Sequence, residues 1–473
     1  MKQNYKVVLL AVLVTAGALL LYLIPPIGDV TKRVWMLSDL FPDSTGRVAE
    51  EMPGLPLAMQ PDTDSTAVAL AADSIAADST LASTDGAPRD MHNTPTVPAN
   101  LPEGTTPILD YSGGANGGMG HIAGLLRGVA KLQRKVRIAY YGDSFIESDI
   151  LTCDLRQLLQ DRFGGEGIGW AGCKLTGTDQ KPTVSITASH IEDRNHLNRG
   201  KFRTSLMGPS LRYYLPQNGA RITYQGTAFR RHLSQWTATQ LYVRAPSGMT
   251  VTTQLPSDSL STTHTLEAQP GVQIVETAGQ TSRIDYSLSF SGSDAQLLGV
   301  TLEGSTGIQL DNFGMRSESG HSLAYIPDDV LQAVAAHHSY DLIIVHFGLN
   351  ATWKGISNAQ CRAYIDKTKQ SIQHLRQYFP AATILVVSVS DRDQRDADGL
   401  HTMDGVERMV AHQAIMAQEL GVCFFNLFEA MGGRDSMSQL VALGHANKDY
   451  THINFKGGAD LAQLIFDALM AYL

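Results

Sequence analysis

The stretch KVRIAYYGDSFIESDILTCDLRQLL at residues 135–159 joins an apolar run, a glycine-bearing turn and a helical pattern. Residues 136–141 favour a short buried strand, a Gly-Asp-Ser turn ends at Ser144, and residues 150–163 have a helical pattern. A strand, a tight turn and a helix in this order open an α/β domain. The stretch therefore predicts an α/β fold with Ser144 at the carboxyl end of its first strand.

The same alternation of strand and helix returns late in the chain. Apolar runs typical of buried parallel strands, and helical patterns between them, occur at residues 340–347, 359–378, 383–389, 405–420, 422–426 and 457–472. Residues 172–305 instead alternate in segments rich in Thr, Ser, Val and Tyr, punctuated by Gly and Pro, which is typical of a β-sandwich. We therefore expect an α/β domain interrupted by an all-β insert.

The N-terminal residues 1–30 contain an uncharged run at residues 7–24, VVLLAVLVTAGALLLYLI. Eighteen helical residues span about 27 Å, close to the hydrocarbon thickness of a bilayer. Lys2 and Lys6 precede the run, which favours a cytoplasmic N-terminus with the bulk of the chain outside the membrane. A cleaved signal peptide is the alternative, but the run is longer than a usual signal core, so we expect an uncleaved membrane helix.

Residues 31–106 are expected to form a disordered acidic linker, because Ala, Ser, Thr, Asp and Pro dominate and large apolar residues are few. Ten acidic and two basic residues fall between residues 43 and 106, which accounts for most of the net charge of -9 in this 473-residue chain. No Lys/Arg cluster is present, so nucleic acid is not an expected partner.

Four cysteines, Cys153, Cys173, Cys361 and Cys423, are widely spaced and form no CxxC pair. No Cys/His spacing suits zinc. Neither a disulfide framework nor a metal site is predicted, and no cofactor is expected.

Three short segments carry side chains suited to acyl transfer. Asp449 and His452 lie three positions apart in a glycine-flanked segment before the last helix, where a carboxylate can fix the tautomer of an imidazole. Ser144 is the best candidate nucleophile, because the N-terminus of the helix expected after it would offer unpaired backbone N–H groups. Asn350, in a Gly-x-Asn sequence, follows a middle strand.

The order of Gly-Asp-Ser, a glycine-bearing turn, Gly-x-Asn and Asp-x-x-His resembles the SGNH (GDSL-type) hydrolase superfamily. The resemblance implies a three-layer, flavodoxin-like hydrolase domain formed by residues 107–171 and 306–473, with residues 172–305 as the insert. It also implies that Ser144 is the nucleophile, His452 the general base and Asp449 its orienting acid. The backbone N–H of Ser144 and the amide of Asn350 would then belong to the oxyanion hole.

The second family motif is where this chain departs from the pattern. The position at which a glycine usually contributes its backbone N–H aligns with Ser317, and Gly314 is the rival assignment. A backbone donor does not require glycine if Ser317 adopts the same dihedral angles. Asn350 is followed by Ala351 instead of the Asp of many relatives.

The sequence around the first motif, at residues 142–152 and 163–169, resembles that of bacterial peptidoglycan O-acetylesterases. The β-rich insert adds to the resemblance, because the insert of those enzymes is similar to a carbohydrate-binding module. The resemblance implies a serine esterase that acts on a cell-wall or surface glycan. The N-terminal run predicts a location that fits, with the protein anchored in the inner membrane and its catalytic domain in the periplasm, or secreted if the N-terminus is cleaved. Its expected partner is an O-acetylated glycan, with Gly314 and Trp353 as candidate substrate contacts. No partner such as a membrane acyltransferase is identified. A carbohydrate O-acetyltransferase and a non-catalytic glycan-binding protein are the alternatives.

Several other polar residues receive a structural interpretation. His346 lies inside an apolar strand and is expected to be a hydrogen-bonded core residue, whereas His337 and His338 are expected at the solvated end of a helix. The charged run at residues 391–398 follows a predicted strand. A solvated loop is the first interpretation of this run, and a substrate contact is the alternative.

Overall fold

The computed structural model describes residues 94–473 apart from 115, 116, 133, 176, 178, 199, 258 and 259. The predicted membrane helix at residues 7–24 lies outside the described residues. No helix within the described part combines the length and the apolar character that crossing a bilayer requires. The predicted linker to residue 106 runs too far, because Thr96 exchanges two backbone hydrogen bonds with Asp110, of 2.8 and 3.0 Å.

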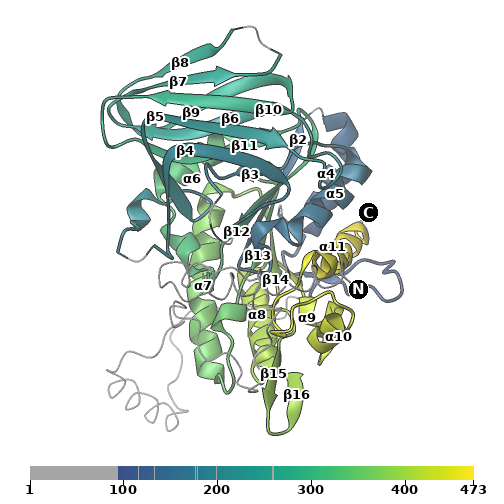
Figure 1. The fold of residues 1–473 in the computed structure, drawn as a ribbon. Coiled ribbons are helices and arrows are strands. Elements are labelled where there is room, and N and C mark those ends of the chain that lie inside the picture. Colours follow the sequence, from purple (N-terminus) through teal and green to yellow (C-terminus); the bar gives the residue numbers. More distant parts are fainter. Residues whose placement is uncertain are drawn as a thin grey trace, which may run out of the picture. The chain divides into compact units, whose positions relative to one another are not determined.

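A six-stranded sheet forms the centre of the α/β part (Figure 1). Its strands, in spatial order, are β1 (Ile108–Asp110), β17 (Cys423–Phe425), β14 (Thr383–Val387), β13 (Leu342–His346), β2 (Lys135–Gly142) and β12 (Gly307–Gly314). All pairs are parallel except β1 with β17. The parallel strands, taken from β12, follow the chain order 2-1-3-4-5, which is the flavodoxin-like arrangement.

Helices cover both faces of this sheet, because its strands are apolar on both sides. One face carries α4 (Met119–Leu132), α5 (Thr152–Phe163) and α11 (Phe455–Met470), and the other carries α6 (Asp328–His337), α7 (Asn358–Tyr378) and α8 (Val406–Leu420) (Figure 1). Short elements complete the connections: η1 (Glu147–Asp149), η3 (His321–Tyr325), η4 (Leu349–Ala351), β15 (Asp393–Asp396), β16 (Gly399–Thr402), α9 (Leu427–Ala430) and α10 (Ser436–Ala442).

The insert has its own buried core, which includes Tyr214, Tyr224 and Trp236. Its strands are β3 (Gly169–Ala171), β4 (Val184–Asn195), β5 (Arg212–Gly226), β6 (Trp236–Ala245), β7 (Met249–Gln254), β8 (Thr262–Leu266), β9 (Gln269–Thr281), β10 (Arg283–Ser289) and β11 (Gln296–Glu303), with η2 (Thr204–Leu206) between β4 and β5.

These nine strands form one hydrogen-bonded antiparallel sheet, where the sequence predicts two sheets of a sandwich. The long strand β5 explains the continuity: Tyr214 in its first half pairs with β11, and its second half, residues 221–225, pairs with β10. A strand that passes from one layer to the next joins the layers into a single sheet. β3 pairs with β11, so the insert's sheet begins at Gly169, three residues before the predicted boundary.

Candidate active site

Ser144 lies two residues after the end of β2 and is 8% exposed. The turn is held by Asp143, whose Oδ1 accepts the N–H of Phe145 at 3.0 Å and whose carbonyl accepts the N–H groups of Ile146 and Glu147 at 3.2 Å each. The backbone N–H of Ser144 donates to no group in the described part of the chain. It is therefore available to a bound oxyanion.

The helix after the nucleophile begins later than the sequence indicates. α5 starts at Thr152, and the 3₁₀ turn η1 lies between it and Ser144. Ser148 and Asp149 have φ values of 57° and 65°, in the left-handed region. These two residues interrupt the helical path, so the N–H of Ser144 belongs to a turn and not to a helix N-terminus.

The base side consists of Asp449 and His452. The Oδ1 atom of Asp449 accepts the backbone N–H groups of Thr451 and His452 at 3.0 Å each, and its Oδ2 lies 2.7 Å from Nδ1 of His452. Burial opposes the charge of Asp449, but the hydrogen bonds from His452 outweigh it and lower the pKa of this carboxyl to about 2. An ionised carboxylate only accepts, so Nδ1 donates and Nε2 is left as an acceptor.

Ser144 and His452 meet although 308 residues separate them. Nε2 of His452 lies 3.0 Å from Oγ of Ser144. Close packing of α11 on the nucleophile loop brings the two segments together, since a Cβ on Gly458 would lie 2.0 Å from the carbonyl oxygen of Ile150. Glycine at this position therefore allows the approach that completes a Ser–His–Asp relay.

Asn350 lies on η4, directly after β13. Its Nδ2 donates to Oδ2 of Asp143 and to the carbonyl oxygen of Glu318, both at 3.1 Å. Asp143 is 2% exposed, and burial raises its pKa to about 6, although the Phe145 N–H and the charge of His452 act in the opposite direction. Asn350 of the third family motif therefore contacts both the first motif, through Asp143, and the second, through Glu318.

The structure separates the two assignments of the second motif. The N–H of Gly314 donates to Oδ1 of Asn312 at 3.1 Å, and a Cβ on Gly314 would lie 2.8 Å from the nitrogen of Glu147. Gly314 is thus buried against the nucleophile loop, a position that does not favour contact with substrate. Ser317 has φ 62°, and its N–H donates to no described group. Ser317 is therefore the better candidate donor.

A buried polar network beneath the nucleophile loop was not predicted from the sequence. Nδ2 of Asn312 donates to the carbonyl of Ile146 at 2.6 Å and to Oγ1 of Thr152 at 2.7 Å. Arg156 donates to both carboxylate oxygens of Asp149, at 3.0 and 3.2 Å, and both side chains are 1% exposed. The acidic and basic residues seven positions apart in 149–156 were a weak signal of this pair. The network fixes the loop that carries Ser144.

The second-motif loop also contacts the insert. The Oε1 atom of Glu318 accepts the backbone N–H groups of Ser319 and Gly320, at 3.0 and 3.1 Å. Nδ1 of His196, which follows strand β4 of the insert, lies 3.9 Å from Oε2 of the same carboxylate. Glu318 therefore shapes the loop around Ser317 and also faces the insert.

One cluster among the described residues, formed by Glu303, Asp311 and His338, has the spacing of metal ligands. Its oxygens already accept hydrogen bonds: Glu303 from Lys135 and Arg137, and Asp311 from Tyr340, His338 and the backbone N–H of Trp170. This donor set fits an ion-pair network between the central sheet and the insert better than a metal.

The predictions about three histidines differ in outcome: His337 is exposed as expected, whereas His338 and His346 are both buried. His346 is 4% exposed, and its Nδ1 lies 3.1 Å from the hydroxyl of Tyr140, so its expected core position is confirmed. His338 is fully buried, so its expected solvated position is wrong. Its partner Asp311, 2.6 Å away, is 27 residues distant in sequence, which the local helical pattern does not reveal.

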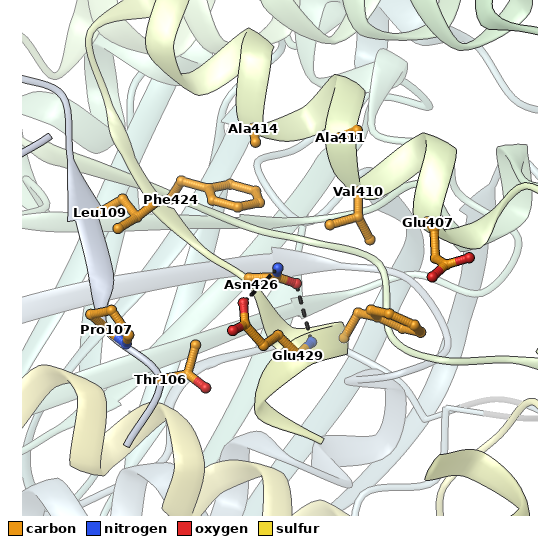
Figure 2. A pocket seen from close by; sticks show the side chains of 11 residues that line it. Thr106, Pro107, Leu109, Glu407, Val410, Ala411, Ala414, Phe424, Asn426 and Glu429 are labelled. Atoms are coloured by element: carbon orange, nitrogen blue, oxygen red, sulfur yellow. Dashed lines mark hydrogen bonds between the residues drawn. The ribbon is translucent and has the colours of Figure 1, made fainter. Parts of the chain in front are cut away.

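A groove of about 410 Å³ lies between strands β1 and β17 and helix α8. Figure 2 shows Leu109, Val410 and Phe424 along it, and Asn426 and Glu429 joined by hydrogen bonds of 3.1 and 3.2 Å. None of the triad residues lines this groove. It is therefore not where Ser144 would meet a substrate.

Comparison with solved structures agrees with this architecture. A structure of a peptidoglycan O-acetylesterase is similar with a TM-score of 0.63 and 20% identity, covering 77% of this chain and 98% of that one. A family two carbohydrate esterase from Cellvibrio japonicus has a TM-score of 0.23 and 11% identity, covering 61% and 98%. Comparison with curated protein sequences gives no match. Only the first of these similarities bears on the fold.

Residues 276–457 match the GDSL-like lipase/acylhydrolase family. The matched range contains Asn350, Asp449 and His452, whereas Ser144 precedes it because the insert separates the two parts of the domain. In the fold, Ser144 contacts His452, and its neighbour Asp143 contacts Asn350. The chain therefore contains a segment similar to the GDSL-like lipase/acylhydrolase family, and the fold places Ser144 against His452 of that segment.

Proposed function

We propose that this protein is a serine esterase that removes O-acetyl groups from a cell-envelope glycan, with peptidoglycan as the preferred substrate. The observation that carries the reaction class is the 3.0 Å contact between Oγ of Ser144 and Nε2 of His452, continued to Asp449 at 2.7 Å. Such a relay activates an alcohol for acyl transfer.

The choice of glycan follows from the extent of the structural likeness. The similarity to the peptidoglycan O-acetylesterase covers 77% of this chain, whereas the two predicted hydrolase segments make up about half of it. The likeness therefore reaches into the insert, which we propose contributes to glycan binding. Trp353, 40% exposed and three residues after Asn350, offers a face on which a sugar ring can stack.

In the proposed reaction, Oγ of Ser144 bonds to the acetyl carbonyl carbon while Nε2 of His452 takes the hydroxyl proton. The oxyanion accepts hydrogen bonds from the N–H groups of Ser144 and Ser317 and from the amide of Asn350. Collapse breaks the ester bond, and the sugar oxygen takes the proton from His452. Water then loses a proton to His452 and attacks acetyl-Ser144. Collapse of this second intermediate releases acetate, and Oγ of Ser144 takes the proton back from His452.

Asn350 must change one contact during this cycle. One of its two N–H groups faces Asp143 and the other faces the carbonyl of Glu318. The amide therefore shares or exchanges its bond to Glu318 when the oxyanion forms. The bond to Asp143 keeps the amide plane oriented meanwhile.

We further propose that the apolar run at residues 7–24 anchors the protein in the inner membrane, with the esterase domain in the periplasm. This placement would bring the active site to the cell wall. N-terminal sequencing of the protein purified from membranes distinguishes an intact anchor from a cleaved signal peptide.

The central test measures acetate released from O-acetylated peptidoglycan and from other O-acetylated polysaccharides. We expect faster release from peptidoglycan, loss of release in Ser144→Ala, and unchanged release in Ser261→Ala, which alters an exposed serine of the insert. Equal activity of the Ser144→Ala variant would contradict the mechanism. Appearance of acetylated sugar in place of free acetate would instead assign the acyl-enzyme to a transferase.

A further inference from the structure

The two backbone donors of the proposed oxyanion hole lie on separate loops. The N–H of Ser144 belongs to the nucleophile loop after β2, and the N–H of Ser317 belongs to the loop after β12. One oxyanion can accept from both only if the two loops keep a fixed spacing, because the donor–acceptor distance of a hydrogen bond varies by only about half an ångström. Contacts between these two loops therefore bear directly on the reaction.

The loop after β12 contains a tight turn at residues 315–318. The N–H of Glu318 donates to the carbonyl of Met315 at 3.2 Å, and Ser317, the third residue of the turn, has φ 62°. A type II turn requires a positive φ at this position, which glycine adopts more readily than serine. The conformation at Ser317 therefore depends more on contacts outside the turn than a glycine turn would.

Both ends of this turn are attached to neighbouring segments. At its start, the N–H of Met315 donates to the carbonyl of Gly142, the last residue of β2, at 3.0 Å. At its end, the carbonyl of Glu318 accepts from Nδ2 of Asn350 at 3.1 Å. In the proposed reaction the amide of Asn350 shares or exchanges this second bond when the oxyanion forms. A further attachment is then needed to keep the turn in place.

Arg316 supplies such an attachment, directly beside Ser317. Its Nε and Nη2 atoms both lie 2.8 Å from Oε2 of Glu147, which follows Ser144 by three residues on the nucleophile loop. The side chain of Glu147 is 4% exposed and that of Arg316 is 38% exposed. A buried carboxylate that lost its cation would be left uncompensated, so this ion pair is more strongly required than a pair with two exposed members.

The carboxylate of Glu147 is itself on a fixed part of the nucleophile loop. The backbone N–H of Glu147 donates to the carbonyl of Asp143 at 3.2 Å, and its carbonyl accepts the N–H of Ile150 at 3.2 Å. The ion pair therefore joins the turn that carries one donor to the loop that carries the other.

We propose that Arg316 is a positioning residue of the esterase: through Glu147 it fixes the spacing between the N–H groups of Ser144 and Ser317 and holds Ser317 at its positive φ. The proposal rests on the esterase chemistry of Ser144 but not on the identity of the glycan. A partly exposed guanidinium beside the site also suits a carboxylate of a substrate. The test therefore uses p-nitrophenyl acetate, an ester without a carboxylate.

The experiment measures kcat and KM for wild type, Arg316→Met, Glu147→Gln and the double variant. We expect kcat to fall about tenfold in Arg316→Met with KM within about twofold of wild type, because the Ser317 donor is displaced and not deleted. The double variant should be no slower than the slower single variant, since both changes break the same contact. Arg316→Lys should stay within about threefold of wild type, because an ammonium group can still pair with Glu147.

Arg134→Met is the matched control. Arg134 is 46% exposed and pairs at 3.0 Å with Asp341, which is 14% exposed, at the opposite end of β2 from Ser144. Its kcat should equal that of wild type.

An unchanged kcat in Arg316→Met would overturn the proposal and leave the ion pair a structural contact. Losses that multiply in the double variant would also overturn it, because the two side chains would then act separately. A rise in KM alone would make Arg316 a binding group. Wild-type protein that releases no p-nitrophenol would instead refute the proposed function, so the two failures are distinguishable. If Glu147→Gln fails to fold, Arg316→Met and Arg316→Lys decide the question.

Discussion

On one side of Ser144 the carboxylate of Asp449 is half exposed and accepts three hydrogen bonds, whereas on the other side the carboxylate of Asp143 is buried and accepts two. The pKa of Asp449 is lowered to about 2, and that of Asp143 is raised to about 6. The surroundings thus shift the pKa values of two carboxylates of one site in opposite directions.

The difference in pKa indicates that Asp449 and Asp143 have different roles in the site. In the proposed reaction, Asp449 acts through its charge, since it stabilises the imidazolium that forms when His452 takes the proton of Ser144. Asp143 acts through geometry, since it orients the amide of Asn350 from a site where its own charge is disfavoured. Changes on the base side should therefore cost more activity than changes on the oxyanion side.

The largest effect is expected from Asp449→Asn, which should lower kcat for p-nitrophenyl acetate about ten-thousandfold. The amide can donate toward Nδ1 of His452, which leaves the imidazole in the wrong tautomer to accept the proton of Ser144. Asp460→Asn is the matched control, because Asp460 forms a similar, partly buried pair with Nδ1 of His445 at 2.5 Å. A kcat within tenfold of wild type would remove Asp449 from the relay.

Asn350→Ala should lower kcat roughly a hundredfold, which corresponds to about 3 kcal/mol of transition-state stabilisation. KM should change little, because the oxyanion forms only after substrate has bound. Asn358→Ala, at the exposed first residue of α7, serves as the control and should leave both constants unchanged. If Asn350→Ala raised KM alone, the amide would be a binding group and not an oxyanion donor.

Asp143→Asn should change how stability depends on pH. The ordinary pKa of 3.8 is raised to about 6 in the folded protein, so between these values the folded state keeps a proton that the unfolded state releases. Wild-type stability attributable to Asp143 is therefore present below pH 4 and lost as pH rises to about 6. The difference amounts to roughly 3 kcal/mol at most.

The measurement is the free energy of unfolding of wild type and Asp143→Asn at about pH 4 and about pH 7.5. Asparagine has one accepting oxygen, so its own NH₂ group would face either the backbone N–H of Phe145 or the amide of Asn350. Two donors that face each other leave a hydrogen bond unmade, which lowers stability at acid pH. The variant should gain relative to wild type as pH rises. A relative stability independent of pH would mean that Asp143 ionises normally in the fold.

The sequence was sufficient to predict the parts of the site that short motifs encode. Ser144 lies in the turn after a strand, and Asp449 and His452 are three positions apart, so local pattern and family resemblance single them out. The contact between Asn350 and Asp143 joins residues 207 positions apart, and no local pattern encodes it. For the same reason the burial of His338 was not predicted, because it depends on a contact with Asp311 on the distant strand β12.

The fold shows the same limit. Apolar runs predicted the central parallel strands, because burial on both faces leaves a composition that is easy to recognise. Strand β12 was not predicted as a strand, since its sequence GIQLDNFG mixes polar and apolar residues. Those polar residues are buried in partner networks, with Asp311 held by Tyr340 and Asn312 by Thr152. Only tertiary structure supplies these partners.

The smallest effect is expected at Ser317, the residue that replaces the usual glycine. Its φ of 62° costs a non-glycine residue about 1 kcal/mol, and glycine's greater freedom in the unfolded chain offsets part of the gain from relieving it. Ser317→Gly should therefore raise the free energy of unfolding by about 0.5 kcal/mol. The backbone N–H is retained, so kcat should stay within about threefold of wild type.

Ser317→Ala separates the hydroxyl from the backbone, because it keeps both the N–H and the strained φ. It should match wild type in kcat and in thermal stability, measured side by side with Ser317→Gly. A fall in kcat of tenfold or more in both variants would show that the hydroxyl, and not the N–H, serves the reaction. The departure from the family pattern would then be a functional substitution, since a backbone donor is indifferent to the side chain it carries.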